Sequence, residues 1–369
     1  MRANEKLFFE LIQIATGCCN TLSRNPSEEE WEAMFALADK HAVAGIAFNA
    51  IEKLVKHGQK PPTDLLLQWI GLSEQIKSRN NIVSQRCNDL EKLLSDTGFR
   101  CCVLKGQGTA LYYNISELRQ SGDIDLWVTK EERCKTDDVR SDVIQFAITQ
   151  GYHIDQIDIK HSDIAFFEDV QVEIHFLPSW MFNPLRNRRL QRFFREQADT
   201  QFSNHDSKVG FTHTTIGFDV VFSLVHIYRH IFEEGVGLRQ LLDYYYILQH
   251  TNDKQRAEAL IVLRSLGMSS FAGGVMYVLQ KYFLLDSNLM LCEANERHGE
   301  FLLSEVLLAG NFGQYDSRYT FQSKEKRFSN GFIQLKRNLR FLFYYPSEVL
   351  WSPFWKLWHW CWRKKKGYL

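Results

Sequence analysis

Apolar and polar residues follow two different periods along this chain, and the change of period divides it into regions. In residues 1–95 apolar side chains recur at helical spacing, and Ser27 followed by three glutamates is typical of a helix start with a capping box. Pro61 and Pro62 interrupt the pattern, which then resumes. We therefore predict a helical N-terminal region without a strand.

A strand-like pattern follows. The apolar run 100–104 ends at a Lys-Gly-Gln-Gly loop, and residues 109–113 are expected to form a short helix. A second strand is expected over 123–128, then a charged helix over 131–150 and two more strands. The last strand, 170–176, alternates strictly between apolar and polar side chains. The order predicts a core of strands and helices.

Helical spacing returns after Pro184 and continues through the rest of the sequence. The clearest helices are predicted over residues 218–233, 237–249 and 260–284. We find no internal repeat and no low-complexity linker. We expect three regions: a helical region over 1–95, a core with a β-sheet over 96–205, and a helical region over 206–369.

Charge and cysteine content narrow the class of protein. Lys plus Arg and Asp plus Glu number 44 each, so no overall basic field favours a nucleic-acid binder. The eight cysteines form no Cys-x-x-Cys pair, which fits reduced thiols better than a disulfide framework. The N-terminal segment is amphipathic rather than signal-like, and no window holds the roughly 18 consecutive apolar residues of a membrane span. We therefore expect a cytoplasmic protein.

Three carboxylates carry the main chemical prediction. Asp123 and Asp125 lie two residues apart on a predicted strand, so both project to one face, and Glu173 occupies the polar face of the later strand. Carboxylates gathered on one face repel unless a cation lies between them. We predict that Asp123, Asp125 and Glu173 are catalytic residues that bind Mg²⁺ or Mn²⁺. The alternative is an edge strand with a solvated polar face.

A glycine loop precedes these carboxylates. Gly106 and Gly108 allow a phosphate to approach backbone N–H groups, and a helix N-terminus with Thr109 in its first turn favours an anion. Lys105 and Arg119 are candidates to neutralise a triphosphate, the alternative being ordinary surface cations. The pattern lacks the Gly-x-x-x-x-Gly-Lys-Ser/Thr of a P-loop. The predicted nucleotide-binding residues are Lys105, Gly106, Gly108, Thr109, Arg119 and Ser121.

Histidines with helical spacing form a further candidate group. His226 and His230 are four residues apart on a polar stripe that includes Asp219, but no Glu follows the first His as in a metalloprotease. A transition-metal site, a substrate contact and a solvated face all fit this stripe. Arg239 and Asp243 are also four residues apart and fit a helix ion pair or a site wall. The candidate substrate contacts are His161, His175, His226, His230, Arg239 and Asp243.

The C-terminal segment is rich in tryptophan and lysine. Residues 351–362 hold five of the nine tryptophans, and four cations follow at 363–366. An aromatic belt beside a basic cluster is typical of a peripheral contact with an anionic membrane surface. A terminal helix packed on the domain is the alternative.

These motifs resemble a known superfamily. The matching pieces are Leu104-Lys-Gly106, Arg119-x-x-Gly-Asp-Ile-Asp125, Lys160-His161, Val172-Glu-Ile-His175 and Gly237-x-Arg239-x-x-x-Asp243. From about residue 103 to 243, the chain resembles the DNA polymerase β-like nucleotidyltransferase superfamily, and specifically its bacterial family of uncharacterised nucleotidyltransferases. The resemblance implies an α+β fold in which a nucleotidyltransferase-like mixed β-sheet core is flanked by N-terminal and C-terminal helical regions.

The same resemblance implies a metal-dependent enzyme. It would transfer a nucleoside monophosphate from a nucleoside triphosphate such as ATP to a hydroxyl acceptor, with release of pyrophosphate. Two departures are visible: the usual Gly-Ser is replaced by a loop whose hydroxyl is on Thr109, and the third carboxylate is Glu173 rather than Asp. The acceptor is unknown, with a small molecule or protein favoured over RNA because the overall charge is neutral, although residues 186–195 are locally rich in arginine. The alternative is a non-catalytic nucleotide-binding sensor or scaffold protein.

Overall fold

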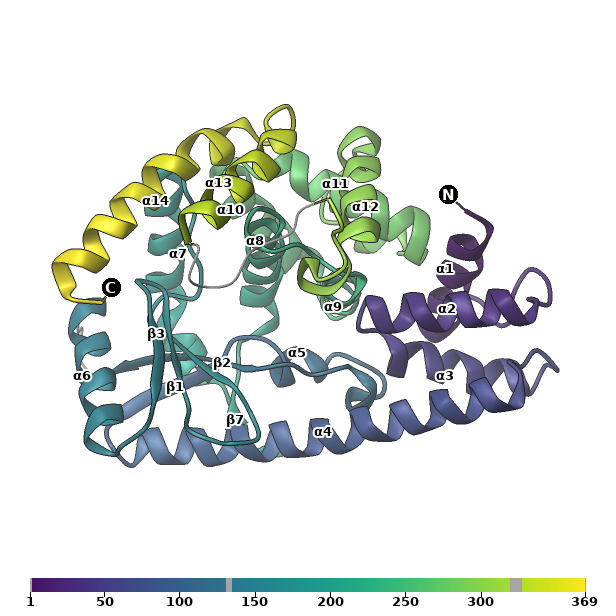
Figure 1. Cartoon of the computed structure of the whole chain (residues 1–369), viewed down its shortest axis with the longest axis horizontal. Coiled ribbons are helices and arrows are strands. Elements are labelled where there is room, and N and C mark those ends of the chain that lie inside the picture. The colour runs from purple at the N-terminus through teal and green to yellow at the C-terminus, as the bar shows by residue number, and fades with distance from the viewer. Residues whose placement is uncertain (1, 131–134, 319–326, 369) are drawn as a thin grey trace.

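The computed structural model describes residues 2–130, 135–318 and 327–368, and it contains a mixed five-stranded sheet surrounded by helices (Figure 1). The strands are β1 Phe99–Val103, β2 Ile124–Lys130, β3 Ile154–Ile157, β4 His161–Ile164 and β5 Val172–His175. Their order is β1-β2-β5-β4-β3, and β2 pairs with β5 in parallel while the other pairs are antiparallel. This arrangement confirms the predicted α+β fold with a mixed sheet.

Four helices precede the sheet. They are α1 Ala3–Ala15, α2 Glu28–Lys40, α3 Ala44–Val55 and α4 Thr63–Ser95. The predicted capping box is present, because Ser27 Oγ accepts from the backbone N–H of Glu30 and the Glu30 carboxylate accepts from that of Ser27. Helix α4 begins directly after Pro62 and runs along the lower edge of the molecule in Figure 1.

The two faces of the sheet have different environments. One face packs against α4 and against α6, Thr136–Thr149, in a cluster that includes Leu90, Leu126, Val143 and Ile174. The other face carries polar residues and also Trp127, which packs against aromatic side chains of the later helices. The polar face is therefore where a site can form.

The later helices form most of the second half of the chain. They are α7 Pro184–Phe202, α8 Ile216–Glu233, α9 Leu238–Gln249, α10 Asp253–Ser265, α11 Ser269–Phe283, α12 Glu296–Ala309, α13 Arg327–Asn338 and α14 Pro346–Lys366. A small hairpin of β6 His205–Asp206 and β7 Phe211–Thr212 lies between α7 and α8. Apolar residues of α1 and α3 share one core with those of α8 and α11. The three-region division of the chain stays a prediction.

Three predicted helices differ from the observed ones. The single helix expected over 260–284 is two helices, because Gly267 adopts a left-handed backbone, φ +68°, after α10. The helix expected over 131–150 is α6, and residues 131–134, with Cys134, lie outside the described residues. The helix expected over 109–113 is α5, Gln107–Ala110, a single turn that begins two residues earlier.

Two features of the described residues concern the predicted cellular location, namely the state of the cysteines and the character of the helices. All seven cysteines in the described ranges are free thiols. Within those ranges, no helix combines the length and apolar character needed to cross a bilayer. Cytoplasmic residence stays a prediction.

Candidate active site

The sheet brings the three predicted carboxylates together. Asp125 on β2 and Glu173 on β5 are directly paired in parallel register, and Asp123 immediately precedes β2 with its side chain on the same face. Each carboxylate offers an oxygen, and these three oxygens lie within 4.8 Å of one another. Carboxylates that are 48 and 50 positions apart in the sequence thus form one oxygen-rich group.

Asp125 is the most buried of the three carboxylates. Its Oδ2 lies 3.0 Å from Lys105 Nζ, and its Oδ1 lies 2.9 Å from His175 Nε2. Burial opposes its ionisation, but Lys105 and His175 outweigh burial and lower the pKa of Asp125. Burial and the charge of Asp125 raise the pKa of Asp123. When all three carboxylates are ionised, Asp123, Asp125 and Glu173 together carry one more negative charge than Lys105 and His175 balance.

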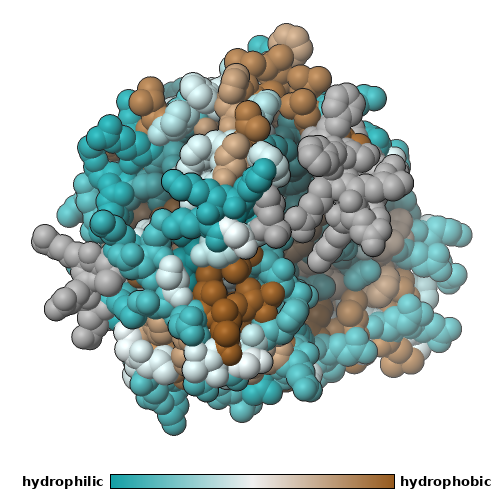
Figure 2. Space-filling view, turned by 60° about the vertical axis from the view of Figure 1, so that its left-hand side comes forward, coloured by the Kyte–Doolittle hydropathy of each residue, from teal (hydrophilic) through white to brown (hydrophobic). Residues whose placement is uncertain are grey.

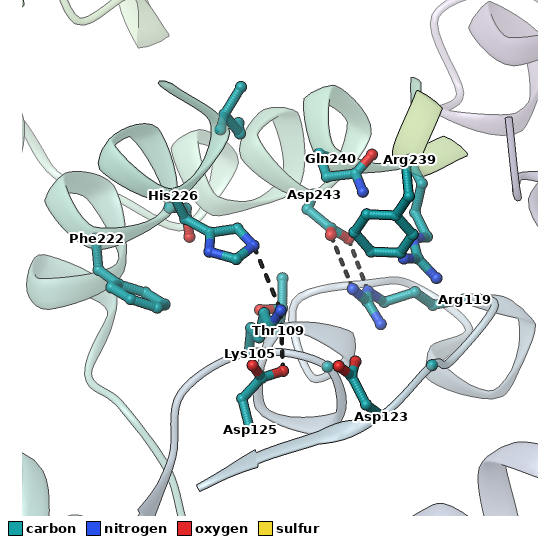
Figure 3. Close-up of a pocket in the computed structure, with 15 residues that line it drawn as sticks. Lys105, Thr109, Arg119, Asp123, Asp125, Phe222, His226, Arg239, Gln240 and Asp243 are labelled. Atoms are coloured by element: carbon teal, nitrogen blue, oxygen red, sulfur yellow. Dashed lines mark hydrogen bonds and ion pairs between the residues drawn. The ribbon is translucent and has the colours of Figure 1, made fainter. Parts of the chain in front are cut away.

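Lys105 links the carboxylates to helix α8. Burial disfavours its ammonium form, but Asp125, Asp123 and Glu173 outweigh burial and raise the pKa of Lys105. The ammonium lies 3.4 Å from Nε2 of His226, and Figure 3 marks this contact with a dashed line. Burial and the Lys105 charge hold the pKa of His226 well below its ordinary value. His226 is therefore neutral and can accept a hydrogen bond from Lys105.

The glycine loop lies beside Asp123. Gly106 has a left-handed backbone with φ +64°, and a Cβ there would lie 3.6 Å from the backbone oxygen of Asp123. The following turn is fixed by Gln107, whose Nε2 donates to the Asn80 carbonyl and the Ser84 hydroxyl of α4. The loop thus depends on glycine for its bend and on α4 for its position.

A cleft that is open to solvent lies at this loop. Its lining includes Asp123 and Asp125 together with the cations Lys105, Arg119 and Arg239 (Figure 3). Arg119 Nη1 and Arg239 Nε are buried without a hydrogen-bond partner among the residues that the structure describes. Oxygen ligands for a cation and unpaired donors for an anion therefore share one cleft.

Arg119 is held by an acidic residue of α9. Its Nε and Nη2 donate to the two carboxylate oxygens of Asp243 at 2.7 and 2.8 Å, and Tyr113 donates to Asp243 at 2.6 Å. Arg239 instead donates to the carbonyl of Gln120 at 2.7 Å. The predicted alternative of an Arg239–Asp243 helix pair is therefore replaced by a pair across two elements, and both residues form part of the cleft wall.

His175 connects two of the carboxylates. Its Nε2 lies 2.9 Å from Asp125 Oδ1 and 3.3 Å from Glu173 Oε2. Burial disfavours its charged form, but hydrogen bonds to both carboxylates outweigh burial and raise the pKa of His175 to about 9. Burial likewise opposes ionisation of Glu173, but His175 lowers the pKa of Glu173. An imidazolium therefore orients Asp125 and Glu173 at neutral pH.

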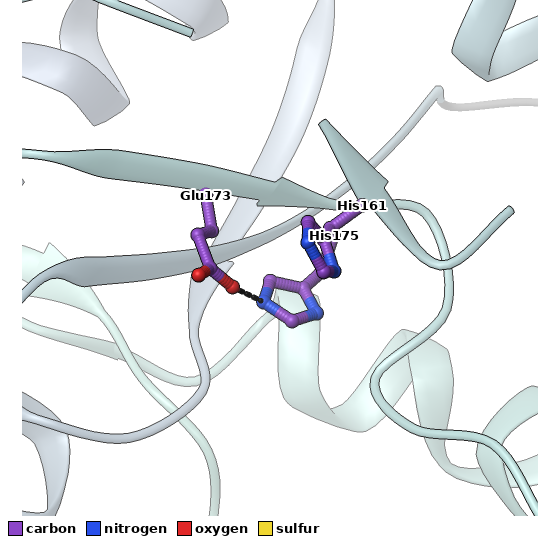
Figure 4. A group of neighbouring side chains, drawn as sticks. All are labelled: His161, Glu173 and His175. Carbon is purple, nitrogen blue, oxygen red and sulfur yellow. Dashed lines mark ion pairs between the residues drawn. The ribbon is translucent and has the colours of Figure 1, made fainter. Parts of the chain in front are cut away.

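His161, Glu173 and His175 form a second group with metal-ligand geometry (Figure 4). His161 on β4 pairs in register with His175 on β5, and their ring centroids are 5.3 Å apart. Burial lowers the pKa of His161 to about 4. Because this group shares Glu173 with the three carboxylates, the two groups cannot each bind a metal independently.

A family comparison bears on these features. The family model described as "Uncharacterised nucleotidyltransferase" matches residues 27–284. This chain belongs to that family. A search of curated proteins finds no match.

The part that matches the nucleotidyltransferase family contains every predicted site residue, and α12 to α14 lie beyond it. Of the predicted nucleotide-binding residues, Lys105, Gly106, Thr109 and Arg119 line the cleft, whereas Gly108 and Ser121 lie outside its lining. Gly108 serves packing, because a Cβ there would lie 3.2 Å from His213 Cβ. The roles of all these residues stay predictions.

The candidate substrate contacts divide in the same way. His226, Arg239 and Asp243 line the cleft, whereas His161 and His175 lie on the sheet behind it. His230 packs against Phe312 and lies 3.4 Å from Glu234, outside the cleft lining.

Two aromatic residues that line the cleft are not predicted as site residues from the sequence. Phe222 lines the cleft from α8 and belongs to no motif of the sequence. Phe312 lies in a short 3₁₀ segment with φ +50° and is brought in from between α12 and α13. Its sequence neighbourhood has no motif, so only the tertiary fold could have revealed it.

Asp219 shows that the polar stripe of α8 is partly structural. The residue is buried and accepts from the hydroxyls of Thr214 and Tyr112 at 2.6 and 2.8 Å. Burial raises the pKa of Asp219 to about 7, although both hydroxyl donors oppose the shift. At this end the stripe therefore faces protein rather than substrate.

This shift predicts a pH dependence of stability. Between about pH 4 and pH 7 the folded protein keeps a proton on Asp219 that the unfolded chain has released, so stability should fall as pH rises, by up to about 1.4 kcal/mol per pH unit. Asp219→Asn should lack this component. Urea unfolding of both proteins across this range measures the difference in slope, and equal slopes would contradict the assignment.

Proposed function

We propose that this protein transfers a nucleoside monophosphate from a nucleoside triphosphate to a hydroxyl acceptor and releases pyrophosphate. The observation that carries the proposal is the joint placement of Asp123, Asp125 and Glu173 beside a cleft lined by Lys105 and arginines. Phosphoryl chemistry of this kind depends mainly on positioning and on charge stabilisation. The family membership supports the same class of reaction.

The donor set fits a hard divalent cation. Asp123, Asp125 and Glu173 offer only oxygen, which suits Mg²⁺ or Mn²⁺. The raised pKa of Asp123, caused by burial and by Asp125, marks negative charge that a cation would relieve. When bound, such an ion supplies neutralisation of phosphate charge and activation of the attacking hydroxyl. The group with His161 fits less well, because His175 is protonated in its present contacts.

The positions of the other charged residues in and beside the cleft indicate their roles in the proposed reaction. Lys105 and the unpaired donors of Arg119 and Arg239 bind the phosphates in the cleft. In the reaction the acceptor oxygen bonds to the α-phosphorus while the bond to the bridging oxygen breaks, and pyrophosphate leaves with that electron pair. We assign the acceptor proton to Glu173, which His175 keeps ionised.

The acceptor class and cellular location belong to the proposal too. Balanced charge over the whole chain favours a small molecule or protein acceptor over RNA. The free thiols of the described cysteines support a cytoplasmic setting. Phe222 and Phe312 line the cleft and offer apolar surface to the base or acceptor.

Transfer of label tests the proposal. Purified protein is incubated with Mg²⁺ and each α-labelled nucleoside triphosphate, with and without a cell extract as the acceptor source, and label transfer and pyrophosphate are followed together. Equal amounts of both products are expected. Tight nucleotide binding without transfer in any extract would instead support the sensor or scaffold alternative.

A further inference from the structure

Among the described residues, helix α14 attaches to the body of the protein mainly along one side, and Trp358 at the margin of that side stacks on Trp180. Its Glu348 is fully buried and accepts from the backbone N–H of Phe182 at 2.7 Å, and His359 Nε2 lies 3.3 Å from Asp158 Oδ1. Trp355 packs against Phe182 on the same side. These contacts fix the helix along its length, so its outer side has a defined orientation.

The outer side of α14 is apolar and exposed. At about 100° per residue, five large side chains fall on one stripe. They are Leu350, Trp351, Phe354, Leu357 and Trp358, which are all exposed. Phe354 is 66% and Leu357 is 63% exposed, which is unusual for side chains of this kind within one helix. Figure 2, with the left-hand side of Figure 1 brought forward, shows hydrophobic areas among hydrophilic ones on this side of the molecule.

Two lysines extend the stripe. Lys364 and Lys365 are exposed and lie within the same arc of the helix as Phe354 and Leu357. The apolar stripe thus ends in positive charge on the side that faces away from the protein. From Leu350 to Lys365 it is roughly 22 Å long at the rise of an α-helix.

We propose that α14 binds flat on the surface of an anionic lipid bilayer through this stripe. Aromatic and leucine side chains on one helix face, continued by lysines, have the composition of interfacial helices. Lys364 and Lys365 add positive charge at the end of the stripe, which an anionic headgroup layer complements. A second copy of the chain would instead present the same lysines. The helix lies beyond the family-matched residues 27–284, so the proposal concerns an addition to the nucleotidyltransferase core.

Flotation with vesicles tests the proposal. The full chain is mixed with vesicles of phosphatidylcholine alone or with phosphatidylserine, and the protein that floats is quantified. Binding to the anionic vesicles is expected, and it should weaken as salt rises. Phe354→Glu with Leu357→Glu should weaken it by at least about tenfold per residue. Lys364→Gln and Lys365→Gln should each weaken it by about fivefold.

A matched control distinguishes binding through this stripe from nonspecific hydrophobic binding to vesicles. Leu67 on α4 is 61% exposed, almost as much as Leu357, and α4 lies along the opposite edge of the molecule (Figure 1). Leu67→Glu should leave flotation unchanged. The proposal is overturned if the unaltered chain does not float, or if Leu67→Glu weakens flotation as much as Phe354→Glu with Leu357→Glu does. It is also overturned if the only effect of Leu357→Glu is to dissociate a dimer seen by light scattering. The measurement needs no catalysis, so it does not depend on the proposed reaction.

Discussion

Asp125→Asn is expected to reduce nucleotidyl transfer on the order of 10³-fold while the protein stays folded. The substitution keeps the shape of the side chain but removes the charge at the centre of the carboxylate group, which should cost several kcal/mol of transition-state stabilisation. The fold should survive because Lys105, the buried cation that pairs with Asp125, still has Asp123 and Glu173 nearby.

The measurement combines label transfer with thermal unfolding. Asp155→Asn is the control, since Asp155 lies on the edge strand β3 with its side chain 69% exposed. This control should retain full turnover. If Asp125→Asn kept turnover within tenfold of the unaltered protein, the assigned chemistry would be wrong. If Asp125→Asn loses turnover but unfolds at the normal temperature, misfolding is excluded as the cause of the loss.

The local part of this site could be predicted because strands alternate. Val172 and Ile174 on one side of β5 place Glu173 on the other, and the same rule places Asp123 and Asp125 together. Periodicity of two residues carries this information without any knowledge of the fold. The sheet then only had to pair the two strands in register for the carboxylates to meet.

The rest depends on contacts between distant segments. Nothing near Arg119 indicates that its partner is Asp243, 124 residues later, and the helical spacing of Arg239 to Asp243 suggested a different pair. Phe312 reaches the cleft from a segment without a motif. The sequence predicts His175 as a substrate contact. Only the strand pairing shows that His175 lies between two carboxylates. Such positions follow from tertiary packing, which a single sequence does not encode locally.

Asp243→Asn is expected to lower the free energy of unfolding by about 3–5 kcal/mol. The Arg119 guanidinium would stay buried without its carboxylate, and Arg239 nearby would add repulsion. The amide retains an oxygen to accept from Tyr113, so the change isolates the lost charge. Urea unfolding provides the measurement.

The exposed ion pair between Lys254 and Glu258 on α10 is the matched control. Glu258→Gln removes a carboxylate from a pair with 83% and 64% exposed side chains, so a change of at most about 1 kcal/mol is expected. Arg119→Met combined with Asp243→Asn should recover much of the lost stability, because neither charge is then buried alone. The double variant should nevertheless lack tight nucleotide binding, since Arg119 also lines the cleft. Recovered stability without recovered nucleotide binding would show that Arg119 has separate roles in stability and in binding. If Asp243→Asn lowers the free energy of unfolding no more than Glu258→Gln does, the buried pair does not hold the cleft wall together.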